Sequence, residues 1–168
     1  METPLQNKAT SRPVISLDPA DYFPRQEEIA IVDLKDFLFQ GLILREKDFR
    51  AQVEATDWSL YRDKYTGIIC SADAIIPLWA WMVISSSLAP YAKDIAVGPA
   101  DQLGDIFQMR RLEQLNPEDY RGQRVVVKGC GDRHVREGAY AIIARKLAPV
   151  SRALMFGEPC STVPVYRN

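Results

Sequence analysis

The chain has 168 residues, with 21 lysines and arginines against 22 aspartates and glutamates, so its formal net charge is −1. This length can bury the core of one domain, and a nearly neutral chain without a basic cluster argues against a nucleic-acid partner. The start lacks the apolar core of a signal peptide, and the longest apolar run, residues 74–84, is shorter than the roughly 20 residues of a spanning helix. We therefore expect a cytoplasmic protein that does not bind membranes.

Residues 1–13 are polar and predict a flexible tail, and residues 14–168 are expected to form a single α/β domain. Runs rich in β-branched residues predict strands at residues 14–17 and 28–34. Residues 47–56 predict a helix with Phe49 and Val53 on one face. The intervening stretch "DFLFQGLIL" is apolar without a clear period, and it fits a strand or a helix equally well.

From residue 65 onward, predicted strands and helices alternate. The first helix accepts Pro77 in its first turn, where the missing N–H costs nothing. Alternation of this kind is typical of an α/β fold with a mainly parallel sheet, here of about five strands, and helices on both faces. The strands are expected at residues 65–70, 94–97, 123–129 and 153–157, and the helices at residues 74–89, 99–115 and 136–148.

Two parts of this region resemble each other. In "GIICSAD" and in "VVVKGCGD" a strand is followed by a cysteine and an aspartate, and each stretch then leads into a helix, the tripeptide "LAP" and a strand closed by glycine. Leu88 and Gly98 are separated by the same number of positions as Leu147 and Gly157. The pattern predicts two βαβ repeats. Chance similarity is the alternative, because βαβ units resemble one another generically.

The three cysteines are candidate ligands of one metal site. Cys70 and Cys130 each follow a strand and precede a helix, which places them at the carboxyl edge of a parallel sheet, where α/β proteins place their sites. Cys160 follows the last predicted strand. Helix N-termini favour thiolates, and three sulfur ligands favour zinc, copper(I) or an iron–sulfur cluster. The candidate fourth ligands are Asp73, Asp101, Asp132 and His134.

The same residues have simpler interpretations. Free cysteines often pack as small hydrophobic residues, and Asp73 and Asp132 suit the N-caps of the helices that follow them. His134, the only histidine, is typical of a surface residue, or it helps the nearby Lys128 and Arg133 to hold an anion. The chain contains no phosphate-binding loop or dinucleotide fingerprint, so the sequence leaves open whether it is an enzyme.

Four blocks carry a family resemblance: "DFLFQGLILREKDFR", "CSADAIIPLWAWM", "VVVKGCGD" and "FGEPCSTVPVY". With them the chain resembles the bacterial family catalogued as domain of unknown function 2480, over nearly all of its length after the tail. The resemblance implies no established activity. Members of this family tend to be encoded near iron–sulfur assembly and sulfur-transfer genes, so the resemblance implies such proteins as partners. The matching blocks contain Cys70, Asp73, Cys130, Asp132, Glu158 and Cys160.

Three hypotheses follow. The first is a metal-binding protein in which Cys70, Cys130 and Cys160 hold zinc or an iron–sulfur cluster, with a link to iron–sulfur cluster assembly. The second is a thiol-based sulfur-transfer or redox protein without metal. The third is an interaction module whose cysteines are buried structural residues.

Overall fold

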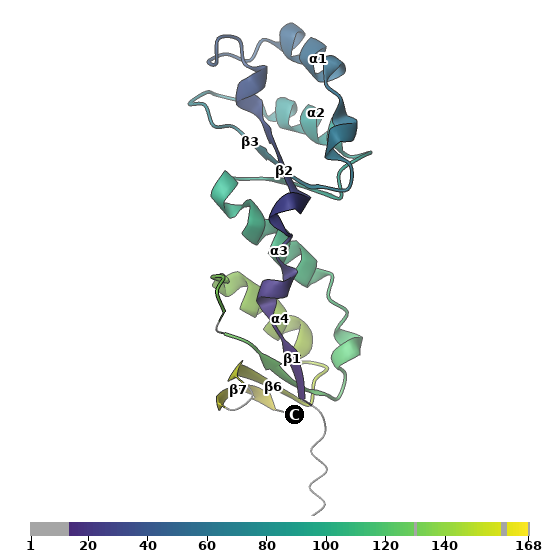
Figure 1. Ribbon diagram of the computed structural model, residues 1–168, viewed down its shortest axis with the longest axis vertical. Coiled ribbons are helices and arrows are strands. Elements are labelled where there is room, and N and C mark those ends of the chain that lie inside the picture. The colour runs from purple at the N-terminus through teal and green to yellow at the C-terminus, as the bar shows by residue number, and fades with distance from the viewer. Residues whose placement is uncertain (1–13, 130, 159–160, 168) are drawn as a thin grey trace, which may run out of the picture. The chain divides into compact units, whose positions relative to one another are not determined.

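The computed structural model describes residues 14–129, 131–158 and 161–167 (Figure 1). The chain divides into two compact units: unit 1 contains Met1–Asp21 and Leu112–Asn168, and unit 2 contains Tyr22–Arg111. The predicted tail at residues 1–13 lies outside the described residues, as do Cys130 and Cys160. Two compact units can belong to one domain or form two. The prediction of a single α/β domain at residues 14–168 therefore stays a prediction.

Unit 2 is built on a three-stranded parallel sheet. Its strands are β2 (Ile29–Asp33), β3 (Tyr65–Ile69) and β4 (Asp94–Val97), in that order across the sheet. Successive residues of a strand point to opposite faces, and the central strand β3 is buried on both, since Tyr65 and Ile68 are each buried. A strand buried on both faces requires helices on both faces of the sheet.

The helices of unit 2 satisfy this requirement. Helices α1 (Glu46–Ala55) and α2 (Leu78–Leu88) lie along one face, where Phe49, Ile84 and Leu88 pack in one cluster with Val32 and Ile68 (Figure 1). On the other face, α3 (Leu103–Glu113) packs Leu103 and Phe107 against Tyr65 and Ala96. Gly67 permits this close approach, because a Cβ there would lie 2.1 Å from Leu103 Cδ1. The predicted placement of helices on both faces is confirmed for this sheet.

Unit 1 contains a four-stranded sheet in the order β1-β5-β6-β7. Strands β1 (Val14–Leu17), β5 (Arg124–Val127) and β6 (Ala153–Glu158) are parallel, whereas β7 (Ser161–Arg167) runs antiparallel to β6 at the edge. The sequence interpretation missed β7, which contains Pro164. An edge strand tolerates proline because one side of the strand needs no hydrogen-bond partner. Helix α4 (Glu137–Leu147) contributes Ala139, Ile143 and Leu147 to the core.

The two units share one plan. The 3₁₀ helix η6 (Pro117–Tyr120), β5, α4 and β6 follow η4 (Trp58–Tyr61), β3, α2 and β4, respectively, by the same number of positions, which we call the repeat offset. Turn bonds also correspond. The amide of Asp63 donates to the carbonyl of Tyr91 at 3.0 Å, and that of Gly122 donates to the carbonyl of Val150 at 2.8 Å. Asp63 and Gly122 both have positive φ, 60° and 67°. The two predicted βαβ units, β3-α2-β4 and β5-α4-β6, are therefore present.

The mixed α/β class and the mainly parallel pairing are confirmed, but the expected single sheet of about five strands is wrong. Two separate sheets exist because β1 and β2, which are close in sequence, pair with different distant strands: β1 with β5 and β2 with β3. Local alternation predicts strands and helices but carries no information on which strands become neighbours.

Two local predictions also need correction. Helix α2 begins at Leu78, not at residue 74, because Pro77 is its N-cap in an extended conformation and the residue before a proline disfavours helix. The ambiguous residues 36–44 contain the end of η3 (Leu34–Phe37) and an isolated bridge between Phe39 and Ile43. Neither a regular strand nor an α-helix forms there.

Candidate functional site

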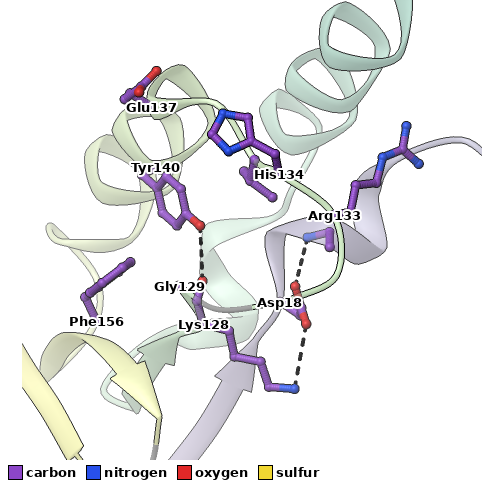
Figure 2. A pocket seen from close by; sticks show the side chains of 11 residues that line it. Asp18, Lys128, Gly129, Arg133, His134, Glu137, Tyr140 and Phe156 are labelled. Atoms are coloured by element: carbon purple, nitrogen blue, oxygen red, sulfur yellow. Dashed lines mark hydrogen bonds and ion pairs between the residues drawn. The ribbon is translucent and has the colours of Figure 1, made fainter.

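A cavity of about 400 Å³ lies at the carboxyl ends of the parallel strands of unit 1 (Figure 2). Asp18 follows β1, Lys128 and Gly129 follow β5, and Phe156 belongs to β6. This edge of a parallel sheet is where α/β proteins place binding sites. The remaining lining residues come from η1 (Pro19–Tyr22), the β5–α4 loop and α4; they are Ala20, Gly131, Arg133, His134, Val135, Glu137 and Tyr140.

Asp18 and Lys128 form an ion pair inside the cavity, with 3.7 Å between Lys128 Nζ and Asp18 Oδ2. Strand pairing sets this geometry, since Leu17 pairs with Val127 and the Lys128 amide donates to the Leu17 carbonyl at 2.9 Å. The other carboxylate oxygen, Asp18 Oδ1, accepts from the Ala20 amide at 2.9 Å. The separation between the ammonium and the carboxylate is too long for a hydrogen bond, so the ammonium group keeps hydrogen-bonding capacity for a ligand.

An aromatic wall closes one side of the cavity. The rings of Tyr140 and Phe156 pack edge to face, with centroids 5.6 Å apart and an interplanar angle of 74°. The Tyr140 hydroxyl donates to the Lys128 carbonyl at 3.4 Å (Figure 2). Gly129 is required for this packing, because a Cβ there would lie 2.0 Å from Phe156 Cζ, whereas a Cβ at Gly131 would meet nothing within 4 Å.

Two basic residues come from the loop between β5 and α4. In Figure 2, His134 lies above the cavity near Tyr140, whereas the guanidinium group of Arg133 points away from Tyr140 and Phe156. The carboxylate of Glu137 also points away from the Lys128–Asp18 pair. The groups that face the cavity therefore include an ammonium, an imidazole and a carboxylate, beside two aromatic rings.

The corresponding position of unit 2 is built differently. Asp33 is the last residue of β2, whereas Asp18 directly follows β1. Asp33 Oδ1 accepts from the amides of Lys35 and Ser71, each at 3.0 Å. Its Oδ2 accepts from the Ser71 hydroxyl at 2.5 Å. Partial burial acts to raise the pKa of Asp33, but the bonds from Ser71 and Lys35 outweigh it and hold that pKa below its ordinary value.

Protein donors thus occupy the Asp33 carboxylate, which ties the end of β2 to the loop after β3. By the repeat offset, the position that corresponds to Lys128 is Ile69, so the aspartate of unit 2 has no lysine at that place. Within the described residues, the pairing of an aspartate and a lysine at the carboxyl edge is a feature of unit 1. The comparison favours a structural role for Asp33 and a binding role for Lys128.

Cys70 lines a second cavity, of about 490 Å³, at the carboxyl ends of β3 and β4 in unit 2. The walls are mostly apolar and include Ile76, Trp81 and Val97. The thiol is half-buried, and it donates to the Ala72 carbonyl with 3.5 Å between Sγ and the oxygen. The prediction that Cys70 follows a strand at the carboxyl edge is confirmed.

The other predicted ligands are scattered. Asp73 and Asp101 are exposed in unit 2, and Asp132 is exposed in unit 1. Asp73 and Asp132 do not cap the following helices as suggested, since Pro77 and Arg136 occupy those N-cap positions. The described residues hold no group of three or more His, Cys, Asp or Glu side chains arranged for a metal ion.

The three-cysteine metal site stays a prediction, since two of its members lie outside the described residues. The three cysteines were expected at one edge of a single sheet. The premise of a single sheet is wrong, because β3, which precedes Cys70 in the sequence, and β5, which precedes Cys130, belong to different sheets. The repeat offset aligns Cys70 with Gly129 and Ser71 with Cys130. Cys70 and Cys130 therefore do not occupy the same position of the repeat; Cys130 is one position further along.

Sequence reasoning missed Asp18 and the aromatic wall. A signal for Asp18 exists in the stretches "LDPADYF" and "VDLKDFL", which begin at Leu17 and Val32. In the first stretch Asp18 directly follows β1, and in the second Asp33 is the last residue of β2. Each stretch then continues into a 3₁₀ helix with a second aspartate and an aromatic residue. This short repeat marks Asp18 and Asp33 as corresponding residues.

The fold and site define an α/β protein with a polar cavity at the carboxyl edge of a mainly parallel sheet. The chain belongs to the family described as protein of unknown function (DUF2480), whose family model matches residues 3–168. No curated protein and no solved structure matches the chain. In the part of the chain that the structure describes, no helix has the length and apolar character needed to cross a membrane.

Proposed function

We propose that unit 1 binds a small molecule that carries an acidic group, a carboxylate or a phosphate, in the cavity beside Lys128. The observation that supports this proposal is an ammonium group at the carboxyl edge of a parallel sheet, inside a cavity of about 400 Å³. A volume of this order suits a small ligand. A lysine ammonium binds carboxylate or phosphate oxygens through charge-assisted hydrogen bonds.

The charge of the lining limits the ligand. Lys128 and Arg133 are balanced by Asp18 and Glu137, so the cavity as a whole does not favour a polyanion. A ligand with one acidic group near Lys128 and His134 fits this balance. The rings of Tyr140 and Phe156 then offer apolar contact to the body of the ligand.

Calorimetric titration of the full chain with inorganic phosphate and, separately, with butyrate, which carries one carboxylate on an apolar chain, tests the proposal and distinguishes the two acidic groups. Lys128→Gln removes the charge but keeps a long polar side chain. We expect binding of the preferred probe to weaken by about tenfold or more, because a hydrogen bond to a charged group contributes about 1.5–3 kcal/mol. Lys47→Gln, an exposed lysine on α1, is the matched control and should bind as the wild type does. Failure of both probes to bind, or unchanged binding by Lys128→Gln, would refute the proposal.

Thiol chemistry at Cys70 is a second candidate, supported by its half-buried thiol on the wall of a cavity. The thiolate of Cys70 takes the terminal sulfur of a persulfide donor, and the donor leaves as a thiol. Sulfur-transfer proteins are the corresponding partners. Mass spectrometry after incubation with a persulfide donor should show one added sulfur atom, lost in Cys70→Ser but kept in Cys130→Ser and Cys160→Ser. Retention of the added sulfur by Cys70→Ser would exclude this role.

Zinc or an iron–sulfur cluster held by Cys70, Cys130 and Cys160 stays a prediction from the sequence. The same holds for iron–sulfur assembly proteins as partners and for a cytoplasmic location. Metal analysis, described in the Discussion, separates this prediction from thiol chemistry at one cysteine.

A further inference from the structure

The cavity beside Cys70 in unit 2 stands at the same place of the fold as the candidate cavity of unit 1. Both lie at the carboxyl ends of the strands of a βαβ unit, and each is lined by the loop after the first strand, the following helix and the second strand. By the repeat offset, Trp81 of α2 corresponds to Tyr140 of α4, and Val97 of β4 corresponds to Phe156 of β6. The repeat therefore gives each unit a cavity of the same architecture with its own side chains.

The two cavities differ in charge. The lining of the unit 1 cavity includes Lys128 and Arg133, whereas the described side chains that line the unit 2 cavity are all uncharged. Ile69 corresponds to Lys128 by the repeat offset, and Ala74 corresponds to Arg133. A charged ligand would lose water in the unit 2 cavity without meeting a side chain of opposite charge, which is costly. This lining therefore favours an uncharged ligand.

The polar side chains on the wall of the unit 2 cavity already bond to the protein. The amide and the hydroxyl of Ser71 both donate to the Asp33 carboxylate. The Cys70 thiol donates to the Ala72 carbonyl, with 3.5 Å between Sγ and the oxygen. A ligand rich in polar groups would have to break these bonds or leave its own groups without partners. Apolar contact with the walls is therefore the main source of affinity that this cavity offers.

An aromatic contact of unit 1 has no counterpart within the wall of the unit 2 cavity. In unit 1 the Phe156 ring packs edge to face on Tyr140, and Gly129 makes room for it (Figure 2). In unit 2, Val97 has no ring to place against Trp81, and the cavity is larger, about 490 Å³ against about 400 Å³. The indole of Trp81 is half-buried on the cavity wall. It therefore offers an aromatic surface to a ring that a ligand supplies.

We propose that the unit 2 cavity binds a small uncharged aromatic molecule, which packs its ring on Trp81. A cavity of this volume suits a small ligand, and its lining combines an aromatic surface with an absence of charge among the described residues. This site is separate from the acid-binding site proposed for unit 1, and binding there requires no reaction at Cys70. Because Cys70 lines the same cavity, its thiol reports whether the cavity is occupied.

Titration of the full chain with N-phenyl-1-naphthylamine tests the proposal, because this uncharged aromatic dye becomes more fluorescent in apolar surroundings. We expect saturable binding. In parallel, iodoacetamide labels the thiols, and mass spectrometry measures the labelling rate of each cysteine. The rate at Cys70 should fall in proportion to dye occupancy, whereas Cys130 and Cys160 are internal references and should keep their rates. A dye that does not bind, or that leaves the rate at Cys70 unchanged, overturns the proposal.

Ile69→Lys tests the selection against charge, since it introduces the residue that unit 1 has at the corresponding position. We expect the binding of N-phenyl-1-naphthylamine to weaken by about tenfold or more, because the ring would remove water from an ammonium group. Anilinonaphthalenesulfonate carries a sulfonate on the same rings, and Ile69→Lys should bind it more tightly than the wild type does. Unchanged binding of both dyes by a folded Ile69→Lys contradicts the proposal. If circular dichroism shows that this variant does not fold, the labelling of Cys70 in the wild type decides.

Met82→Gln is the matched control for dye bound to the outer surface of α2. Met82 is 72% exposed on that helix and does not line the cavity. This variant should bind N-phenyl-1-naphthylamine as the wild type does. Loss of dye binding in Met82→Gln would place the dye on the outer surface of α2 and would overturn the proposal.

Discussion

Replacing Gly129 with alanine tests whether the close approach of Phe156 shapes the candidate cavity. The new Cβ would lie 2.0 Å from Cζ of Phe156 and 2.6 Å and 2.8 Å from its Cε2 and Cε1. Carbon atoms prefer separations of about 3.5–4.0 Å, so the ring must move. Phe156 is 39% exposed, and its ring can swing toward solvent. That movement loses the contact with Tyr140, worth about 0.5–1.5 kcal/mol, together with some apolar burial. We expect Gly129→Ala to lower the free energy of unfolding by about 1–2 kcal/mol.

Urea denaturation followed by circular dichroism measures this loss. Gly131→Ala is the matched control: it lies on the same loop, lines the same cavity and offers open space to a Cβ. Its effect should stay within about 0.5 kcal/mol. The comparison separates crowding at one position from any general intolerance of the loop to alanine.

A double-mutant cycle with Phe156→Ala identifies the cause. If the ring is the obstacle, Gly129→Ala should cost almost nothing once the ring is absent, and the coupling energy between the two positions should be about 1–2 kcal/mol. An equal cost of Gly129→Ala in both backgrounds would contradict the reasoning, because the alanine would then act through something other than Phe156.

Two further predictions concern Asp33 and the cysteines. Because the pKa of Asp33 is lowered in the folded protein, its stabilising contribution is fully present above the ordinary aspartate pKa of about 3.9 and is lost as the pH falls through the folded value. Asp33→Asn should therefore lose less stability than the wild type between neutral pH and about pH 3 in melting-temperature measurements; equal losses would argue against the assignment. Protein purified without oxygen and without a metal-affinity tag should, if the sequence prediction holds, contain nearly stoichiometric zinc, or iron with visible thiolate absorption. Cys70→Ser, Cys130→Ser and Cys160→Ser should each lower that content, whereas metal-free protein with three titratable thiols would rule out a three-cysteine site.

Sequence patterns were sufficient to locate strands β1 to β6 and helices α1 to α4, but not β7 or the 3₁₀ helices. Runs of β-branched residues located β1 and β2, and the alternation after residue 65 located both βαβ units. The helical period placed Phe49 and Val53 of α1 on its buried face. These predictions succeed because the periodicity of apolar residues is set by local backbone geometry. Prolines lie where two of these predictions differ from the structure: Pro77 at the start of α2, and Pro164 within the missed strand β7.

Long-range packing, by contrast, selected which strands share a sheet and which side chains share a cavity. Any extended segment offers the same backbone donors and acceptors, so the choice of β5 for β1 and of β3 for β2 depends on packing between residues far apart in sequence. That choice brings Asp18 next to Lys128. No spacing rule connects those two residues, because the distance along the chain that separates them is closed only by the pairing of β1 with β5.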